Sequence, residues 1–448
     1  MTQIKTLDSS PSADISVSVV GLGHVGLVTA LGLAEMGWRV LGTDQDSRKL
    51  ESIKAGEAPF YEPGLQELLD KHLDSGLFNP LADLDDSISR ASVVFLCVGT
   101  PQRSNGEADL SQLESVARSV AQRRNDYLLV VEKSTAPVTS AQWIGRTVER
   151  YGHSKDRIDI ACNPEFLREG TAVHDFLNPD RIVLGVETDR ARDILLQIYA
   201  PLDCPKLVTD LNTAELIKHA SNAFLSTKIS FINMVANLCE ATGADVTKVS
   251  EGLGLDPRIG RSFLNAGIGF GGYCFPKDIR AFAHIGEVHG VNMSLLRAVE
   301  DINLDRVERF IARLRSHLWM LNGKTVAVLG LAFKPGTDDV RESPAVAVAR
   351  RLREDGANLR LYDPQAGIHA RSLLPAEPGR VEYFDDPYKA VQQADAALVL
   401  TEWPEFAELD LGRVKKLMRV PILGDGRNVY DPSSVRKLGF EYFSVGRP

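Results

Sequence analysis

The sequence predicts an α/β protein in which two doubly wound domains are joined by a central domain of long helices. Short apolar strands alternate with helical segments near both ends of the chain, whereas the middle holds a helical run from Ala214 to Ala241 without glycine or proline. A chain of 448 residues is also too long for one core. We expect a flexible extension over residues 1–14 and domains at residues 15–205, 206–320 and 321–448.

The composition argues against several classes of protein. With 44% hydrophobic and 25% charged residues the chain is an ordinary globular protein, and its net charge of −9 argues against nucleic acid as a partner. No apolar run approaches the roughly 18 residues of a membrane helix. The cysteines include no C-x-x-C pair, so we expect no disulfide framework, no metal site and a reducing, cytoplasmic location. They are Cys97, Cys162, Cys204, Cys239 and Cys274.

A glycine-rich turn follows the first expected strand, residues 15–20, and precedes a helix expected over residues 27–36. In a Rossmann fold, the pattern G-x-G-x-x-G makes the turn, admits a pyrophosphate to the helix N-terminus and allows close packing. The next strand, residues 39–43, ends in Asp44, whose carboxylate accepts ribose hydroxyls and repels a 2′-phosphate. The turn therefore predicts NAD rather than NADP as the cofactor. The expected cofactor residues here are Gly21, Gly23, Val25, Gly26, Asp44 and Lys49.

Small and polar residues follow the later strands of this domain. Strands are expected over residues 92–98, 128–132, 158–162 and 181–185. The first three end in the segments Gly99-Thr100-Pro101, Lys133 to Val138 and Asn163 to Gly170. Because doubly wound sheets bind ligands at the carboxyl ends of their strands, these segments are candidate binding loops.

The central helices lead to a cysteine in a glycine loop. Lys218 and Asn222 lie four residues apart on the helix at 214–241 and so share a face. Further helices are expected over residues 246–253 and 295–318. Between them, four glycines in residues 267–272 allow close approach of a ligand and lead to Cys274, with Lys277 and Asp278 just beyond. This arrangement would present a reactive thiol.

A second α/β unit begins with the strand at residues 325–329 and continues with a helix at 344–354 and strands at 358–362 and 396–400. Its first turn lacks G-x-G-x-x-G but carries Lys334 and Arg341, so we expect it to bind an anionic ligand other than a dinucleotide.

These motifs together resemble the UDP-glucose/GDP-mannose dehydrogenase family over nearly the whole chain after residue 14. The motifs are GLGHVG, YEPGL, CVGTP, EKSTAPV, NPEFLREG, ELIKHASNAF, RIGRSFLNAGIGFGGYCFPKD and LGLAFKPGTDDVRESP. The resemblance implies oxidation of a primary alcohol on a nucleotide sugar to a carboxylate by two NAD⁺, through a thioester on the cysteine. CFPKD together with YEPGL resembles the UDP-glucose branch, so UDP-glucose is the expected substrate and partner.

The resemblance also implies roles for individual residues. Cys274 matches the nucleophile, and Lys218 and Asn222 match the pair near the reacting oxygen. Asp278 and Glu165 match the acids in proton transfer, and Thr135 matches the residue that positions water and cofactor. Which acid serves which step stays open.

Other matches concern binding. Thr100, Glu169 and Arg341 match cofactor positions, and Arg258 matches an arginine that reaches the sugar nucleotide across a dimer interface. Tyr273 departs from the family, which usually has serine there. The expected substrate-binding residues are Glu165, Phe166, Leu167, Lys218, Asn222, Arg258, Phe263, Asn265, Phe270, Gly271 and Lys334.

Three alternatives remain at the level of sequence. The same chemistry could act on GDP-mannose or a UDP-N-acetylhexosamine. A two-electron hydroxyacid dehydrogenase would share the first domain and the Lys218/Asn222 pair but leaves Cys274 without a task. A non-catalytic regulator that binds NAD or a sugar nucleotide would not need Cys274, Lys218 or Asp278. The helix at 214–241 is apolar on all sides, which, with the resemblance, predicts a homodimer or a higher homo-oligomer.

Overall fold

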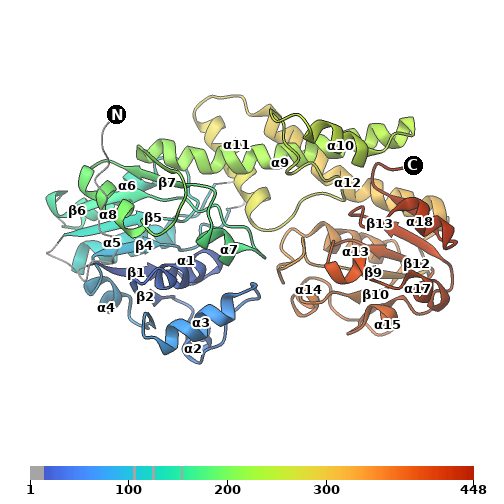
Figure 1. Cartoon of the computed structure of the whole chain (residues 1–448), viewed down its shortest axis with the longest axis horizontal. Coiled ribbons are helices and arrows are strands. Elements are labelled where there is room, and N and C mark those ends of the chain that lie inside the picture. Colours follow the sequence, from blue (N-terminus) through green and yellow to red (C-terminus); the bar gives the residue numbers. More distant parts are fainter. Residues whose placement is uncertain (1–14, 104–106, 124–126, 153–154) are drawn as a thin grey trace. The chain divides into compact units, whose positions relative to one another are not determined.

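A computed structural model describes residues 15–103, 107–123, 127–152 and 155–448. The chain divides into two compact units, residues 1–220 and 221–448, and the long helix α9 (Leu211–Thr242) passes from the first into the second (Figure 1). The expected extension over residues 1–14 lies outside the described residues. The division into three domains stays a prediction.

The first unit is built on a sheet whose described strands lie in the order β3-β2-β1-β4-β5-β6-β7-β8. Neighbouring strands are parallel except β6 and β7, which are antiparallel. The strands are β1 (Ser16–Val20), β2 (Arg39–Thr43), β3 (Phe78–Pro80), β4 (Val93–Leu96), β5 (Leu128–Glu132), β6 (Ile158–Cys162), β7 (Ile182–Val186) and β8 (Lys206–Thr209).

Helices cover both faces of this sheet because alternate strand residues point to opposite sides. Val17 and Val19 of β1 pack in one buried cluster with α1, α2, α3, α7 and α8, whereas Val20 packs in another with α4, α5 and α6. The helices are α1 (His24–Glu35), α2 (Ser47–Lys54), α3 (Leu65–Asp74), α4 (Leu84–Ser89), α5 (Ser111–Arg123), α6 (Ser140–Arg150), α7 (Ala172–Leu177) and α8 (Asp189–Ile198), with a 3₁₀ turn at Lys155–Arg157. The unit is therefore doubly wound, as the sequence predicts.

The second unit combines helices with a second sheet. After α9 come α10 (Val246–Gly254), α11 (Cys274–Val288) and α12 (Ser294–Leu318). The described strands of its sheet are parallel, in the order β11-β10-β9-β12-β13-β14. They are β9 (Thr325–Leu329), β10 (Asn358–Tyr362), β11 (Val381–Tyr383), β12 (Ala396–Val399), β13 (Ile422–Asp425) and β14 (Glu441–Ser444). The helices that accompany this sheet are α13 (Pro344–Glu354), α14 (Gly367–Leu373), α15 (Pro387–Val391), α16 (Pro404–Ala407), α17 (Leu411–Leu417) and α18 (Pro432–Lys437).

The predicted fold class is confirmed, with small differences at element ends. The helix expected from residue 27 begins at His24, because Gly23 already occupies its N-cap position. The helix expected over residues 214–241 extends from Leu211 to Thr242. The helix that begins at Cys274 was not expected. Among the described residues, no helix is both long and apolar enough to span a bilayer.

Candidate active site

The turn after β1 has the geometry of a dinucleotide cradle. Gly21 has a φ of +92°, which favours glycine, and its N–H donates to the carbonyl of Thr43 at 2.8 Å. A Cβ on Gly26 would lie 1.7 Å from the carbonyl oxygen of Gly21, so only glycine allows α1 to approach the turn. A Cβ on Gly23 would meet no atom within 4 Å, which leaves open space at the N-terminus of α1. These features fit a bound pyrophosphate.

Asp44, the residue expected to accept the ribose hydroxyls, is bound to the turn itself. Its Oδ2 accepts from the N–H of Leu22 at 2.7 Å and from Lys49 Nζ at 2.8 Å. Burial alone would raise the pKa of Asp44, but hydrogen bonds from Lys49, Asp46 and Leu22 outweigh it and hold the pKa below its usual value. The carboxylate is therefore ionised at neutral pH, as discrimination against a 2′-phosphate requires. Val25 lies half-buried beside this turn on α1.

Lys218 and Glu165 form a buried ion pair in the first unit. Lys218 Nζ lies 2.8 Å from Glu165 Oε1, and both side chains are almost completely buried. The ammonium also lies 5.5 Å from the ring centre of Phe166, within range of a cation–π interaction. Glu165 lies just after the carboxyl end of β6, and Lys218 lies on α9. The structure thus brings together three predicted site residues.

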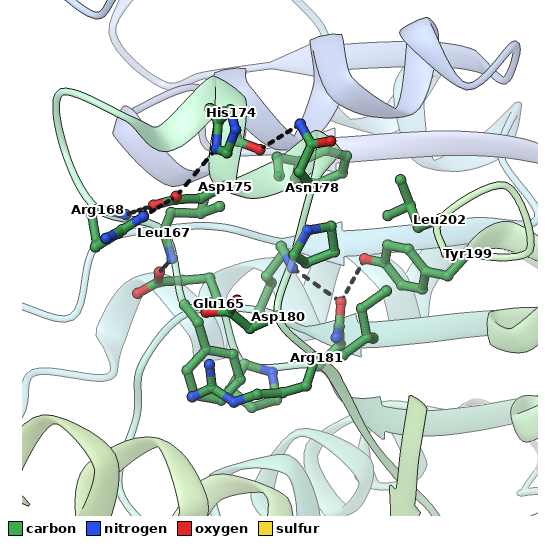
Figure 2. Close-up of a pocket in the computed structure, with 17 residues that line it drawn as sticks. Glu165, Leu167, Arg168, His174, Asp175, Asn178, Asp180, Arg181, Tyr199 and Leu202 are labelled. Carbon is green, nitrogen blue, oxygen red and sulfur yellow. Dashed lines mark hydrogen bonds and ion pairs between the residues drawn. The ribbon is translucent and has the colours of Figure 1, made fainter. Parts of the chain in front are cut away.

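A hollow of about 130 Å³ lies beside this pair. Figure 2 shows it with the Arg168–Asp175 ion pair at one edge and Tyr199 at another. Glu165, Phe166 and Leu167 line it, and the Leu167 N–H donates to Glu165 Oε2 at 2.7 Å. The loop therefore folds back on its own carboxylate, which fixes the orientation of Glu165.

Glu62, which is not among the predicted site residues, holds the far end of the same loop. Its buried carboxylate accepts from the N–H of Gly170 at 2.6 Å and from that of Ala172 at 2.8 Å. The N-cap residue of α7, Thr171, makes no capping hydrogen bond with its own side chain. Glu62 therefore caps α7 from a distance and steadies the segment that contains Glu169, which is half-buried. Glu62 lies in YEPGL, but no local pattern indicates a partner more than 100 residues away.

The turn that carries Thr135 is held in a similar way. Thr100 Oγ1 donates to the Thr135 carbonyl at 2.7 Å. Glu215 on α9 accepts from the N–H of Thr139 at 2.6 Å and of Ala141 at 2.9 Å, and so caps α6. Burial, followed by the neighbouring Glu215, raises the pKa of Glu132 well above its usual value. Burial also raises the pKa of Glu215, so the two neighbouring carboxyl groups beneath the Thr135 turn resist being ionised together.

Cys274 begins helix α11 in the second unit, and it is exposed. The partial positive charge at a helix N-terminus favours a thiolate over a thiol. By contrast, Cys97, Cys162 and Cys239 are buried, and burial raises the pKa of each. Among the described cysteines, Cys274 therefore has the position of a nucleophile.

Asp278 lies one turn after Cys274 and is almost completely buried. Its Oδ2 accepts from Asn222 Nδ2 at 2.6 Å, and its Oδ1 lies 2.7 Å from Lys277 Nζ. The structure therefore joins Asn222 to Asp278 within the second unit. Lys218 precedes Asn222 by one turn of α9, so helical spacing places both side chains on one face.

The glycine loop before Cys274 is tightly enclosed. Phe270 packs with Ile279, Leu296 and Val299, and a Cβ on Gly271 would lie 2.3 Å from the Glu342 carbonyl oxygen. Phe263 has a φ of +65°, which is rare for a bulky residue. Asn265 is exposed and accepts from Arg261 Nη2 at 2.6 Å.

Arg258 lies apart from this loop's enclosed part. Its side chain is 87% exposed and forms an ion pair with Asp256 at 2.6 Å. Its expected role across a dimer interface stays a prediction.

The turn after β9 carries the predicted anion-binding residues. Arg341 donates from Nε and Nη2 to Asp339 and lies 4.6 Å from the ring centre of Tyr273. Lys334 is half-buried, with its ammonium 5.5 Å from the Phe333 ring centre. Tyr273, the residue that departs from the family pattern, therefore contacts a predicted cofactor residue.

The chain matches models of the UDP-glucose/GDP-mannose dehydrogenase family in three parts: the NAD binding domain over residues 15–203, the central domain over 212–305 and the UDP binding domain over 327–432. It is 41% identical over 432 residues to UDP-glucose 6-dehydrogenase TuaD of Bacillus subtilis, covering 96% of this chain and 93% of that protein. A solved UDP-glucose dehydrogenase of Pyrobaculum islandicum superposes with a TM-score of 0.91 at 40% identity, covering 99% of this chain and all of the other. A solved UDP-D-ManNAc dehydrogenase of Pyrococcus horikoshii superposes with a TM-score of 0.85 at 29% identity, covering 97% and 99%.

Proposed function

Because the chain belongs to the UDP-glucose/GDP-mannose dehydrogenase family, we propose that it uses NAD⁺ to oxidise the C6 alcohol of UDP-glucose to the carboxylate of UDP-glucuronate. The observation that most supports this proposal is the position of Cys274, an exposed thiol at a helix N-terminus, one turn from the buried Asp278–Asn222 pair. The higher identity to UDP-glucose dehydrogenases than to the UDP-D-ManNAc enzyme supports the choice of sugar.

The first oxidation requires loss of a proton and a hydride from the alcohol. NAD⁺, when bound, accepts a hydride in each of the two oxidations. The buried Lys218 stabilises negative charge that develops on the substrate oxygen, and Glu165, its ion-pair partner, is a candidate base. Thr135 positions the reacting groups. These residues leave an aldehyde at C6.

Cys274 then retains the intermediate. Its thiolate forms a C–S bond with the aldehyde carbon, and protonation of the oxygen gives a thiohemiacetal. Loss of a hydride and of the hydroxyl proton gives a thioester. One water adds to the acyl carbon and the C–S bond breaks, which releases the carboxylate and regenerates the thiol. We assign to Asp278 and Asn222, joined at 2.6 Å, the role of orienting the groups around the sulfur.

Product analysis tests this proposal. We expect two NADH and one UDP-glucuronate per UDP-glucose consumed, with weaker kcat/KM for GDP-mannose and UDP-N-acetylglucosamine. One NADH per sugar with free aldehyde as the end product would restore a two-electron dehydrogenase. No turnover of any nucleotide sugar would favour a binding protein.

Cys274→Ser tests the covalent step. A serine hydroxyl is a poorer nucleophile and its ester a poorer acyl donor, so overall turnover should fall by several orders of magnitude. An acyl ester on the protein should appear as a mass increase. Unchanged turnover with two NADH per sugar would remove the thioester from the mechanism.

The proposal includes a homodimer formed through α9. Phe224, Phe231 and Leu238 are exposed and lie seven residues apart, so they form a nearly straight apolar stripe on this helix. Large exposed apolar stripes of this kind are typical of subunit interfaces. Sedimentation should give a dimer at micromolar concentration, and Phe231→Asp should shift it toward the monomer. A wild-type monomer would contradict this part of the proposal.

We also propose a cytoplasmic location, because nucleotide sugars and NAD, the expected substrates, are present in that compartment.

A further inference from the structure

The backbone of the glycine loop is held by side chains from other elements of the second unit. The Gly267 N–H donates to Asn233 Oδ1 at 2.9 Å, and Arg306 Nε donates to the Gly267 carbonyl at 3.2 Å. Arg427 Nη1 donates to the Gly269 carbonyl at 3.0 Å. A loop with four glycines loses much conformational freedom when it is ordered. These bonds offset that cost.

Asn303 on α12 binds the loop four residues before Cys274. Nearer the cysteine, the Gly272 N–H donates to the Arg341 carbonyl at 3.0 Å. Asn303 Oδ1 accepts from the Phe270 N–H at 2.8 Å, and its Nδ2 donates to the Phe270 carbonyl at 3.0 Å. One side chain thus satisfies both polar groups of a residue four positions before Cys274. Gly269 has a φ of +113°, and a Cβ there would lie 2.9 Å from Asn303 Oδ1, so this glycine and Asn303 are sterically matched.

The helix that carries Asn303 is anchored by contacts within the second unit. Arg306 lies three residues further along α12 and therefore on the same face. It is almost completely buried, bonds to Asn237 and lies 4.0 Å from Glu240. Beyond it, Ile311, Leu314 and Leu318 pack into the core of the second sheet. α12 therefore connects that core to the loop.

From this geometry we propose that Asn303 is a positioning residue for Cys274, acting through Phe270 and the glycine loop. It deepens the proposed function, on which its kinetic part rests. Phe270 also packs with Ile279 of α11, so the position of Phe270 bears on the helix that begins with the nucleophile. Loss of this clamp, the two hydrogen bonds between Asn303 and the Phe270 backbone, would leave Cys274 present but poorly aligned.

The test compares Asn303→Ala and Asn303→Asp with the wild-type protein. Asn303→Asp keeps an acceptor for the Phe270 N–H but removes the donor to its carbonyl. We expect kcat to fall about 10- to 100-fold in Asn303→Ala, as misplacement of a reacting group by about 1 Å produces, and less in Asn303→Asp. The KM for NAD⁺ should stay within about twofold, because Asn303 lies outside the NAD-binding turn.

Alkylation of Cys274 by iodoacetamide, followed by peptide mass spectrometry, gives a readout independent of the substrate. A thiol that loses its place at the helix N-terminus should react about two- to fivefold more slowly. Ile311→Val on the same helix is the matched control for stability, with an expected cost of about 1 kcal/mol and no change in alkylation. Asp301→Asn controls for an exposed change on α12.

Slower alkylation and lower kcat in the Asn303 variants, but not in Ile311→Val, would support positioning. Wild-type rates in Asn303→Ala would overturn it, and so would an equal loss in Ile311→Val. If Asn303→Ala does not fold, Asn303→Asp decides the question by the same criteria. Failure of the wild-type protein to oxidise UDP-glucose would count against the proposed function alone, because the alkylation rates would still test the clamp.

Discussion

The first turns of the two sheets share a backbone design but differ in what they leave accessible. Gly21 and Gly330 both have positive φ, and the N–H of each donates at 2.8 Å to the carbonyl of the residue directly before an aspartate, Thr43 and Tyr362 respectively. No residue separates these acceptors from the aspartates: Asp44 follows Thr43 and Asp363 follows Tyr362. Each aspartate accepts from the N–H after its glycine at 2.7 Å. The aspartate is therefore part of the turn in both domains.

The two carboxylates differ in their hydrogen-bond partners, and this difference indicates different functions. Asp363 also accepts from the N–H groups of Ala332, Gln365 and Ala366 and from the Trp403 indole. Asp44 likewise accepts from the N–H two residues on, that of Asp46, at 2.9 Å, but its further partner is the partly exposed side chain of Lys49. A lysine side chain can move to admit a ribose, whereas four backbone donors and an indole cannot. We therefore expect dinucleotide binding at Asp44, which a displaceable side chain faces, and not at Asp363.

Gly23→Ala should have the largest effect, because it gives the first turn, Gly21-Leu22-Gly23, the sequence of the second, Gly330-Leu331-Ala332. The φ of −81° at Gly23 suits alanine, and its Cβ meets no protein atom, so the fold should persist. The methyl group would occupy the expected pyrophosphate space and weaken NAD⁺ binding by about 100-fold. Calorimetry with NAD⁺ checks this, and unchanged affinity would mean that the pyrophosphate binds elsewhere.

Asp363→Asn should affect stability rather than cofactor binding. An amide cannot accept from all of the N–H groups around Asp363, and a buried donor without an acceptor costs about 1–3 kcal/mol. Urea denaturation measures the loss. A change in NAD⁺ affinity without a change in the free energy of unfolding would break the contrast between the two turns.

Asp44→Asn should act on selectivity. Loss of the negative charge removes the repulsion of a 2′-phosphate, so the ratio of kcat/KM for NAD⁺ over NADP⁺ should fall about tenfold. The bond to Leu22 can persist through the amide oxygen, which limits the effect on stability. The same ratio as in the wild type would show that Asp44 serves only the turn.

Glu132→Gln should have the smallest effect, on the pH dependence of stability. β5 and β13 occupy equivalent places in the two sheets and end in the buried acids Glu132 and Asp425. Burial raises the pKa of both, but Asp425 accepts from Tyr430 N–H and Tyr442 Oη, whereas Glu132 faces Glu215. A raised pKa in the folded state means that stability falls as pH rises above the usual value near 4.5.

The substitution should therefore reduce the stability lost between pH 5 and pH 8, since glutamine has no proton to lose. Denaturation curves at both pH values give the difference. An unchanged pH dependence would show that Glu132 does not hold the proton.

Local patterns in the sequence were sufficient for most of the architecture. The strands at residues 39–43, 128–132 and 325–329 have the predicted bounds because dense β-branched and apolar residues mark buried parallel strands. Edge strands such as β3, with the sequence Phe-Asn-Pro, lack that signal and were not predicted. The helix at Cys274 was hidden by the glycines before it and by Pro276, which a first helical turn tolerates.

The candidate site was predictable only where motifs contain its residues. The motifs predict Lys218, Glu165, Asn222 and Asp278 as site residues, but not that Lys218 pairs with Glu165 and Asn222 with Asp278. Asn303 and Glu62 were not named as site residues because their effect arises from tertiary contacts with distant loop backbone. No period or spacing in a single sequence reports such contacts.

The capping of α6 by Glu215 has a practical consequence for gene fragments. A fragment that stops at residue 205 would omit Glu215, along with Leu211 and Ala214, which fill the cluster beneath α5 and α6. The N–H groups of Thr139 and Ala141 would lose their acceptor, and the turn that carries Thr135 would lose its support. An expression vector for the NAD-binding part should therefore extend its reading frame into α9, through residue 220, where the first compact unit ends.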